Sequence, residues 1–201
     1  MPAEPFLKRA VAFFDGQNLF HAARAAFGYR TPSYDARALA GLIARRHGWR
    51  LIGTHFYTGM PDPGESAHWH RFWVAKLAAM QRAGVHTISR PLAYRTQLTT
   101  LPDGSVARVR VGQEKGIDVR IALDVVRLAR EGAYDVALIF SQDQDLCEVA
   151  TEIRAIARMQ ERWIKVASAY PASPSSRNTR GIDRTDWLPI TREEYECCLE
   201  G

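Results

Sequence analysis

The sequence predicts an α/β fold in which a mostly parallel central sheet is flanked by helices and carries a projecting β-hairpin arm. Two observations support this fold. Short apolar runs alternate along the chain with stretches of helical spacing, which is typical of a parallel sheet covered by helices. In addition, residues 90–115 have the polar, β-branched composition of an exposed hairpin. With 201 residues, the chain is expected to form a single domain over 1–201.

The first half of the chain supplies three strands and three helices. Short apolar runs predict strands at 10–14, 51–57 and 85–89. Helices are predicted at about 18–27, 35–47 and 66–84, with Asp35 and Ser66 as N-caps of the second and third. A glycine ends each helix: Gly28, Gly48 and Gly84.

Residues 90–115 form the predicted arm. They contain threonines and other β-branched residues, with a turn at Pro102-Asp103-Gly104 between two polar strands. Five basic residues stand against two acidic ones, so the arm has a net charge of +3. The basic residues are Arg90, Arg95, Arg108, Arg110 and Lys115, and the acidic ones are Asp103 and Glu114.

The second half of the chain returns to alternating elements. A helix is predicted from Ile117, because apolar residues recur there at helical spacing, and it ends at Gly132. Strands are predicted at 136–140 and 163–168, with a helix from about 143 to 159 between them. The tail, about 171–201, begins with a polar loop at 171–180 and ends with a helix that Thr191 caps.

Composition sets broad limits on function. Hydrophobic residues make up 46% and charged residues 24% of the chain, which is typical of a globular protein. Apolar runs are far shorter than the roughly 20 residues of a membrane span, and no signal peptide is recognisable after Met1. The three cysteines lack metal-site or disulfide spacing, so we expect a cytoplasmic protein. The net charge of +5 agrees with a nucleic-acid partner, and equally with an arginine-rich proteome.

Four aspartates are expected at one edge of the sheet. Asp15 follows the first strand, Asp143 and Asp145 follow the strand at 136–140, and Asp118 opens the helix after the arm. Ligands of open parallel sheets bind beyond the carboxyl ends of the strands. Clustered carboxylates repel one another unless a cation neutralises them, and hard ions such as Mg²⁺ or Mn²⁺ prefer carboxylate oxygens. The four aspartates therefore predict a divalent-metal site.

Each of these residues also has a purely structural interpretation. Aspartate is favoured at turns and helix N-caps, although two carboxylates within three residues exceed what one cap needs. Asn18 either orients a ligand or caps the first helix, and Ser141 either binds a metal water or phosphate or ends its strand. Lys115 either meets a phosphate oxygen or is an ordinary exposed lysine.

Three acidic motifs resemble the signatures of the NYN domain family, a PIN-like group that includes the LabA proteins. The motifs are Phe14-Asp15-Gly16-Gln17-Asn18, Lys115-Gly116-Ile117-Asp118-Val119 and Ser141-Gln142-Asp143-Gln144-Asp145-Leu146. Tyr57-Thr58-Gly59, Arg90-Pro91-Leu92 and the tail at 180–187 also fit, so the resemblance extends over roughly 10–190. The family commonly has Gly where this chain has Gln142, and a bulkier side chain there is expected to reshape the pocket without removing the acids.

The resemblance implies a Rossmann-like PIN nuclease fold and metal-dependent cleavage of RNA. The matching positions imply that Asp15, Asp118, Asp143 and Asp145 are the catalytic metal ligands, with Asn18, Ser141 and Lys115 in support. Bound metals would activate water and neutralise the charge that develops during phosphodiester hydrolysis. Acids alone would repel RNA, so we expect a basic approach beside the pocket, formed by Arg95, Arg108, Arg110 and Lys115.

Other candidate residues and functions have weaker support. The aromatic residues of His68-Trp69-His70-Arg71-Phe72-Trp73 either stack on bases or pack a helix against the sheet. Asp124 is expected to be structural or to support the ligands, and Asp183 is a weaker candidate for the pocket. No dinucleotide or P-loop motif is present.

Two rival functions remain open. One is an RNA-binding or scaffold module with a metal-binding pocket and little or no turnover. The other is a phosphohydrolase of small substrates, which is disfavoured because Gln17 stands where aspartyl-phosphate enzymes carry a second aspartate. If the arm arginines do not bind RNA, they contact a second subunit or only aid solubility. A homodimer therefore also remains open.

Overall fold

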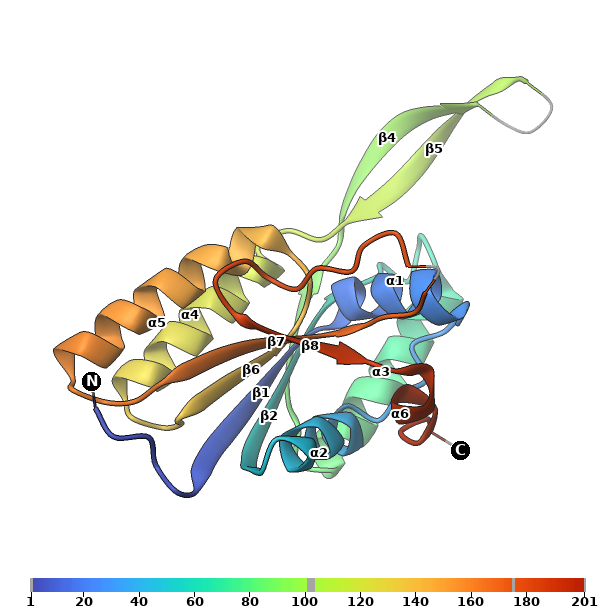
Figure 1. The fold of residues 1–201 in the computed structure, drawn as a ribbon. Coiled ribbons are helices and arrows are strands. Elements are labelled where there is room, and N and C mark those ends of the chain that lie inside the picture. Colours follow the sequence, from blue (N-terminus) through green and yellow to red (C-terminus); the bar gives the residue numbers. More distant parts are fainter. Residues whose placement is uncertain (1, 101–103, 175, 201) are drawn as a thin grey trace.

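A computed structural model describes residues 2–100, 104–174 and 176–200 and shows one central sheet with six strands in the order β3-β2-β1-β6-β7-β8 (Figure 1). Every neighbouring pair in this sheet is parallel. The strands are β1 (Lys8–Asp15), β2 (Trp49–Met60), β3 (His86–Pro91), β6 (Val136–Phe140), β7 (Lys165–Pro171) and β8 (Asp186–Ile190). The chain starts in the middle of the sheet, builds outward on one side, and then returns to build the other.

Helices cover both faces of the sheet. One face carries α1 (Gly16–Phe27), α2 (Ala36–Arg46), α3 (Ala67–Arg82) and the short α6 (Arg192–Glu196). The other carries α4 (Ile117–Arg130) and α5 (Cys147–Met159), the latter preceded by a 3₁₀ turn at Gln144–Leu146. Figure 1 shows these two layers on opposite sides of the sheet.

The central strand β1 explains why two cores form. Successive side chains of a strand point to opposite faces. Ala10, Ala12 and Phe14 therefore pack under α1, α2 and α3, whereas Val11 and Phe13 pack under α4 and α5. A strand buried on both faces reads as a continuous apolar run, as the sequence predicted.

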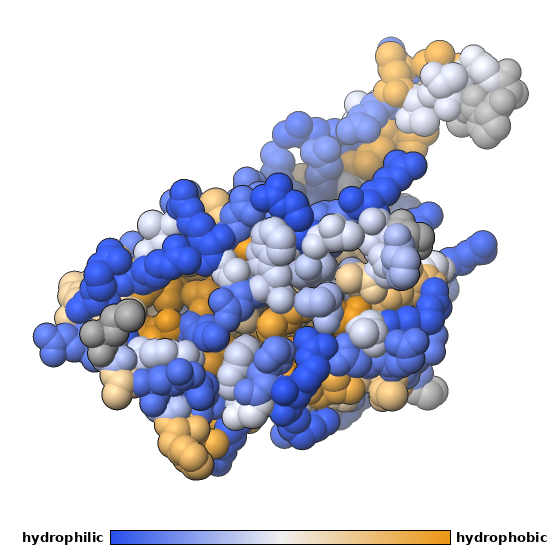
Figure 2. All heavy atoms as spheres, viewed as in Figure 1, coloured by the Kyte–Doolittle hydropathy of each residue, from blue (hydrophilic) through white to orange (hydrophobic). Residues whose placement is uncertain are grey.

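The arm is a two-stranded antiparallel hairpin of β4 (Ala93–Thr100) and β5 (Val106–Gln113) that projects from the body of the molecule (Figure 1). Its root is attached to the loop after β2, because the Asp62 backbone N–H donates to the Tyr94 hydroxyl at 3.1 Å. Beyond the root, apolar Leu98 and Val106 are exposed beside polar neighbours (Figure 2). The hairpin prediction is confirmed, although Pro102 and Asp103 of the expected turn lie outside the described residues.

The structure departs from the sequence prediction in a few places. Strand β8 was not predicted, because Asp186–Ile190 is short and contains Pro189, a residue that strands tolerate at a sheet edge. Ser66 takes the N-cap position of α3 without a side-chain hydrogen bond. In the described part of the chain, no helix is long and apolar enough to cross a membrane.

Candidate active site

The candidate site lies where the strand order reverses, between β1 and β6. The carboxyl ends of these two central strands are neighbours, and the chain leaves them in opposite directions, into α1 on one face and α5 on the other. Such a switch point leaves a crevice beyond the strand ends where ligands of open α/β sheets bind. Asp15 is the last residue of β1, and Ser141 directly follows β6.

Asp15 is the buried centre of the site, with only 5% of its surface exposed. Its Oδ1 accepts the Asn18 backbone N–H at 3.1 Å, and its Oδ2 accepts the Ser141 hydroxyl at 3.3 Å. Burial raises the pKa of Asp15 to about 6, against the effect of these hydrogen bonds and with further raising by Asp143 and Asp118. Among the described residues, no cationic side chain is one of the causes of this shift.

Asp15 is the N-cap of α1, so the structural interpretation of this residue is correct without excluding a ligand role. The backbone must turn from strand to helix within one residue. Gly16 allows this, since a Cβ there would approach the Phe56 ring at 2.7 Å and the Tyr57 carbonyl oxygen at 2.8 Å. Asn18 is therefore inside the helix and is not its cap; its side-chain oxygen instead accepts the Gln142 N–H at 2.9 Å.

Asp143 reaches the site through a short hydrogen-bonded turn after β6. The Asp143 N–H donates to the Ser141 hydroxyl at 3.0 Å, and the same hydroxyl donates to Asp15. Oδ1 of Asp143 accepts the Asp145 N–H at 3.0 Å and caps the 3₁₀ turn. Each cap uses one carboxylate oxygen, so the cap and the metal-ligand interpretations are compatible.

Asp118 enters from the other face of the sheet, on the first turn of α4. Gly116 holds the N-cap position with φ of 71°, a left-handed conformation that glycine adopts without strain. Asp118 is half-buried, and its charge raises the pKa of Asp15. The structure thus brings Asp15, Asp118 and Asp143 within electrostatic reach of one another.

Glu114 is an acidic residue of the site that sequence reasoning counted only as an arm charge. It ends the return from the arm, and its Oε1 accepts the Gly59 backbone N–H. Burial, with a smaller contribution from the charges of Asp15 and Asp118, raises the pKa of Glu114 to about 7 against the effect of the hydrogen bond from Gly59. The sequence feature that could have identified Glu114 as a site residue is its position directly before the Lys115 motif, where the arm rejoins the sheet edge.

Asp145 lies apart from this buried group. It is exposed, and its charge is not among the causes of the shifted pKa of Asp15. Its side chain instead lines an apolar groove between α4 and α5, together with Asp118. Asp145 therefore forms the outer rim of the site, whereas Glu114 occupies the interior position expected of a fourth carboxylate.

The donor set fits a hard divalent cation. All four interior side chains are carboxylates, which suit Mg²⁺ or Mn²⁺, and no arginine or lysine pairs with Asp15 or Glu114 in the described structure. As they stand, no three His, Cys, Asp or Glu side chains of the described residues lie close enough together to hold an ion. Coordination would therefore require the carboxylates to turn toward a common point.

Gln142 explains how the chain tolerates a larger residue in its third motif. Its Nε2 donates to the Arg180 carbonyl oxygen at 2.7 Å. Gln144 donates similarly to the Gly181 carbonyl oxygen at 3.0 Å. These two amides hold the segment around 178–183 against the site, so Gln142 shapes a neighbouring wall and leaves the acids in place.

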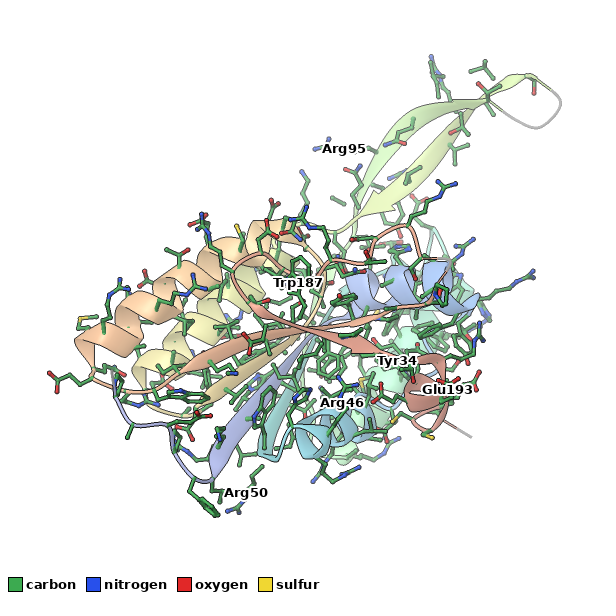
Figure 3. All side chains as sticks on the ribbon, viewed as in Figure 1. Tyr34, Arg46, Arg50, Arg95, Trp187 and Glu193 are labelled. Carbon is green, nitrogen blue, oxygen red and sulfur yellow. The ribbon has the colours of Figure 1, made fainter. Side chains whose placement is uncertain are left out.

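The predicted basic approach is divided by the geometry of the arm. Paired residues of an antiparallel hairpin share a face, and the register pairs Thr96 with Arg110 and Leu98 with Arg108. Arg108 and Arg110 therefore share one face, while Arg95 lies on the other (Figure 3). The arm projects outward from the body of the molecule (Figure 1). The register therefore divides the arginines of the predicted basic approach between two faces of the arm, and Lys115 is exposed at its base.

The remaining candidates have structural roles. Asp124 is buried and accepts hydrogen bonds from Tyr57, Arg120 and Arg127. Asp183 pairs with Arg180 at 2.8 Å.

Comparison with known proteins agrees with this geometry. The NYN domain model matches residues 9–182, which include Asp15, Glu114, Asp118, Asp143 and Asp145. The chain belongs to the NYN domain family. Its fold is accordingly that of the PIN-like nucleases, as the three acidic motifs indicated. No curated protein sequence matches the chain.

Solved structures add support for the fold of this NYN domain. A crystal structure of a protein of unknown function from Vibrio parahaemolyticus matches with a TM-score of 0.54 and 18% identity, over 94% of this chain and 95% of that one. A deacetylase of teicoplanin biosynthesis matches with a TM-score of 0.32 and 16% identity, over 79% of this chain and 68% of that one. The first likeness extends along nearly the whole of both chains, and the second is too weak to support an argument.

Proposed function

We propose that this NYN domain is a divalent-metal-dependent ribonuclease that hydrolyses RNA phosphodiester bonds at the carboxylate group of Asp15, Glu114, Asp118 and Asp143. One observation carries the proposal. The buried Asp15 and the half-buried Glu114 each have a raised pKa near the switch point of a parallel sheet, and no cationic side chain of the described residues pairs with them. Such an arrangement is unfavourable for folding alone and is typical of functional sites.

The residues of the site suit this chemistry. Asp15, Asp143 and Asp118 would hold Mg²⁺ or Mn²⁺, with Glu114 beside them and Asp145 at the rim. A bound ion would supply activation of water and neutralisation of the charge on the phosphate. Ser141 keeps Asp15 and Asp143 in register through its hydroxyl, and Asn18 fixes the turn through the Gln142 N–H. Lys115, exposed at the edge, would contact a phosphate oxygen.

Incubation of the purified protein with single-stranded and structured RNAs, in Mn²⁺ or in EDTA, tests the proposal. We expect cleavage in Mn²⁺ that EDTA abolishes and that Asp143→Asn reduces by about 100-fold or more, since a metal ligand is lost. Asp183→Asn is the matched control, because Asp183 pairs with Arg180 outside the carboxylate group. Equal activity of wild type and Asp143→Asn would contradict the proposal.

A second function is favoured by one specific observation. No three of the described carboxylates are already placed to hold an ion. An RNA-binding module with weak or no turnover would share the fold and the acidic pocket. In that case RNA would bind without being cut under any metal condition, which the same experiment detects.

A further inference from the structure

Trp69, in the aromatic segment 68–73, does not pack into the hydrophobic core. Trp73 and Phe72 pack into the core beneath α3. Trp69 is instead half-buried at the surface, with the rings of Phe72 and His68 each against it at centroid distances of 5.4 Å. Its indole N–H makes no hydrogen bond to any described residue. An amphipathic ring in this state is free to meet a ligand.

Trp69 lines a surface cavity of about 240 Å³. Phe20, Trp73 and Pro32 form the rest of its apolar wall, and His21 and Gln17 add polar groups to the lining. Whole small-molecule sites usually occupy about 300–1,000 Å³. The smaller size and aromatic wall fit a single flat ring system.

The cavity opens beside the candidate active site. Gln17 lines it from the first turn of α1, two residues after Asp15, and offers a side-chain amide that both donates and accepts hydrogen bonds. His21 lines both this cavity and a neighbouring one that contains Asn18 and Gln142. The N-terminal half of α1 therefore connects the aromatic cavity with the residues around the carboxylates.

The arm reaches the same cavity at its root. Gly112 of β5 lines the cavity and pairs with Tyr94. Because every second residue of a strand shares a face, Gly112, Arg110 and Arg108 lie on one face of the arm. Arg110 lies over the Tyr94 ring and pairs with Glu65, whereas Arg108 has no carboxylate partner among the described residues. A basic face thus continues outward from the aromatic cavity.

We propose that the cavity of Trp69 and Phe20 stacks one unpaired nucleobase of an RNA strand, and that the Arg110 and Arg108 face of the arm binds the backbone of the adjoining nucleotides. This inference rests on the proposed function and adds to it a base subsite at α1 and α3 and a backbone-binding face on the arm. A base within a duplex cannot enter the cavity, whereas an unpaired base has both faces free for stacking. Arg95, on the opposite face, takes no part.

RNA affinity tests the stacking step directly. Binding of a labelled single-stranded oligoribonucleotide is measured by fluorescence anisotropy in an Asp143→Asn background, which prevents cleavage during the measurement. We expect Trp69→Ala to weaken binding about 10-fold or more and Trp69→Phe to restore most of it, because a ring remains to stack. Unchanged affinity in Trp69→Ala, or equal losses in Trp69→Ala and Trp69→Phe, would overturn the base subsite.

The two faces of the arm supply a matched control. Arg108→Ala and Arg95→Ala each remove one exposed arginine from the same hairpin. Binding is measured between about 50 and 200 mM salt, and the logarithm of the affinity is plotted against the logarithm of the salt concentration. We expect Arg108→Ala to weaken RNA binding and to reduce the steepness of this plot by about 1, and Arg95→Ala to change neither. Equal effects of the two variants would remove the face-specific path and leave only a general charge effect.

A substrate without bases separates this inference from the proposed function. With Mn²⁺, Trp69→Ala should slow cleavage of single-stranded RNA but leave hydrolysis of bis(p-nitrophenyl) phosphate unchanged. If it slows both equally, the base subsite is wrong. If wild type and Asp143→Asn hydrolyse both substrates equally, the proposed function fails, and the binding measurements still decide whether Trp69 contacts RNA.

Discussion

Two pairs of carboxylates in this molecule, Asp124 with Asp135 and Asp15 with Glu114, differ in the side chains that surround them. Asp124 and Asp135 each accept several hydrogen bonds from arginines, and the pKa of each lies below its ordinary value despite burial. Asp15 is buried and Glu114 is half-buried, but neither has a basic partner among the described residues, and the pKa of each is raised, to about 6 and about 7 respectively. Side chains of the same chemical type are thus in opposite electrostatic states.

The difference separates structural from functional acids. The first pair is neutralised within the chain, so it requires nothing further in order to fold. The second pair has no cationic partner in the described structure, so its charge is neutralised either by protonation or by an added cation. The comparison predicts opposite responses to mutation, pH and metal.

The largest change in the free energy of unfolding is expected when Asp124 is mutated. Its carboxylate accepts the Tyr57 hydroxyl at 3.0 Å and two Arg120 nitrogens at 2.9 Å. Asp124→Ala leaves these donors without a partner and should lower the free energy of unfolding by about 2–4 kcal/mol, measured by urea unfolding in EDTA. Glu131→Ala is the control, since it removes an exposed partner of Arg127 and should cost at most about 0.5 kcal/mol. Equal losses would mean that Asp124 is not a structural acid.

The opposite response is expected at Asp15. In EDTA, Asp15→Asn should raise the free energy of unfolding by about 1–2 kcal/mol, because it removes a buried charge and the new side-chain oxygen still accepts the Asn18 N–H. Mn²⁺ at about 100 times its Kd should stabilise the wild type by about 2–3 kcal/mol and the variant far less. A wild-type melting temperature that millimolar Mn²⁺ leaves unchanged would contradict metal binding.

The dependence of stability on pH should separate the two pairs again. In metal-free protein, raised pKa values of Asp15 and Glu114 mean that the folded state holds more protons between about pH 4.5 and 7, so their contribution falls as pH rises. The contribution of His55 to stability rises with pH instead, because burial and the charge of His86 lower its pKa to about 4. The stability advantage of an Asp15→Asn, Glu114→Gln double variant over wild type should therefore grow by about 1–2 kcal/mol from pH 5 to pH 7. An advantage that does not change with pH would show that these carboxyls titrate normally.

Much of this architecture was predictable because the local signals agree with one another. The buried runs of β1 and β6 each end at an acidic motif, so the sequence places Asp15 and Asp143 at one sheet edge. Asp118 was predictable from its position at the start of α4. The positions of these residues could be predicted from hydrophobic periodicity and helix capping, which are properties of short segments.

The rest depends on tertiary placement. Glu114 looked like an arm charge, and only the fold shows that the arm delivers it beside Gly59 and Asp15. Strand β8 is stabilised by pairing with β7 more than by its own sequence, which includes Pro189. The separation of Arg95 from Arg108 follows from the register of β4 and β5, which spacing within one strand does not determine.

The smallest effect on stability, and the sharpest test of where the site ends, concerns Asp145. This side chain is exposed, and its backbone N–H, which Asn would retain, donates to Asp143. Asp145→Asn should therefore change the free energy of unfolding in EDTA by less than about 0.5 kcal/mol, unlike Asp15→Asn.

The response of Asp145→Asn to metal then decides its role. If the ion draws the rim carboxylate inward, the Mn²⁺ concentration that half-stabilises the protein should rise several-fold, because one anionic ligand is lost while the buried ones remain. Glu148→Gln, an exposed acid that lines the same groove one turn along, is the control and should leave that concentration unchanged. We expect the shift in Asp145→Asn alone. Identical metal titrations for both variants and wild type would restrict the ligands to the interior carboxylates and make Asp145 part of the groove only.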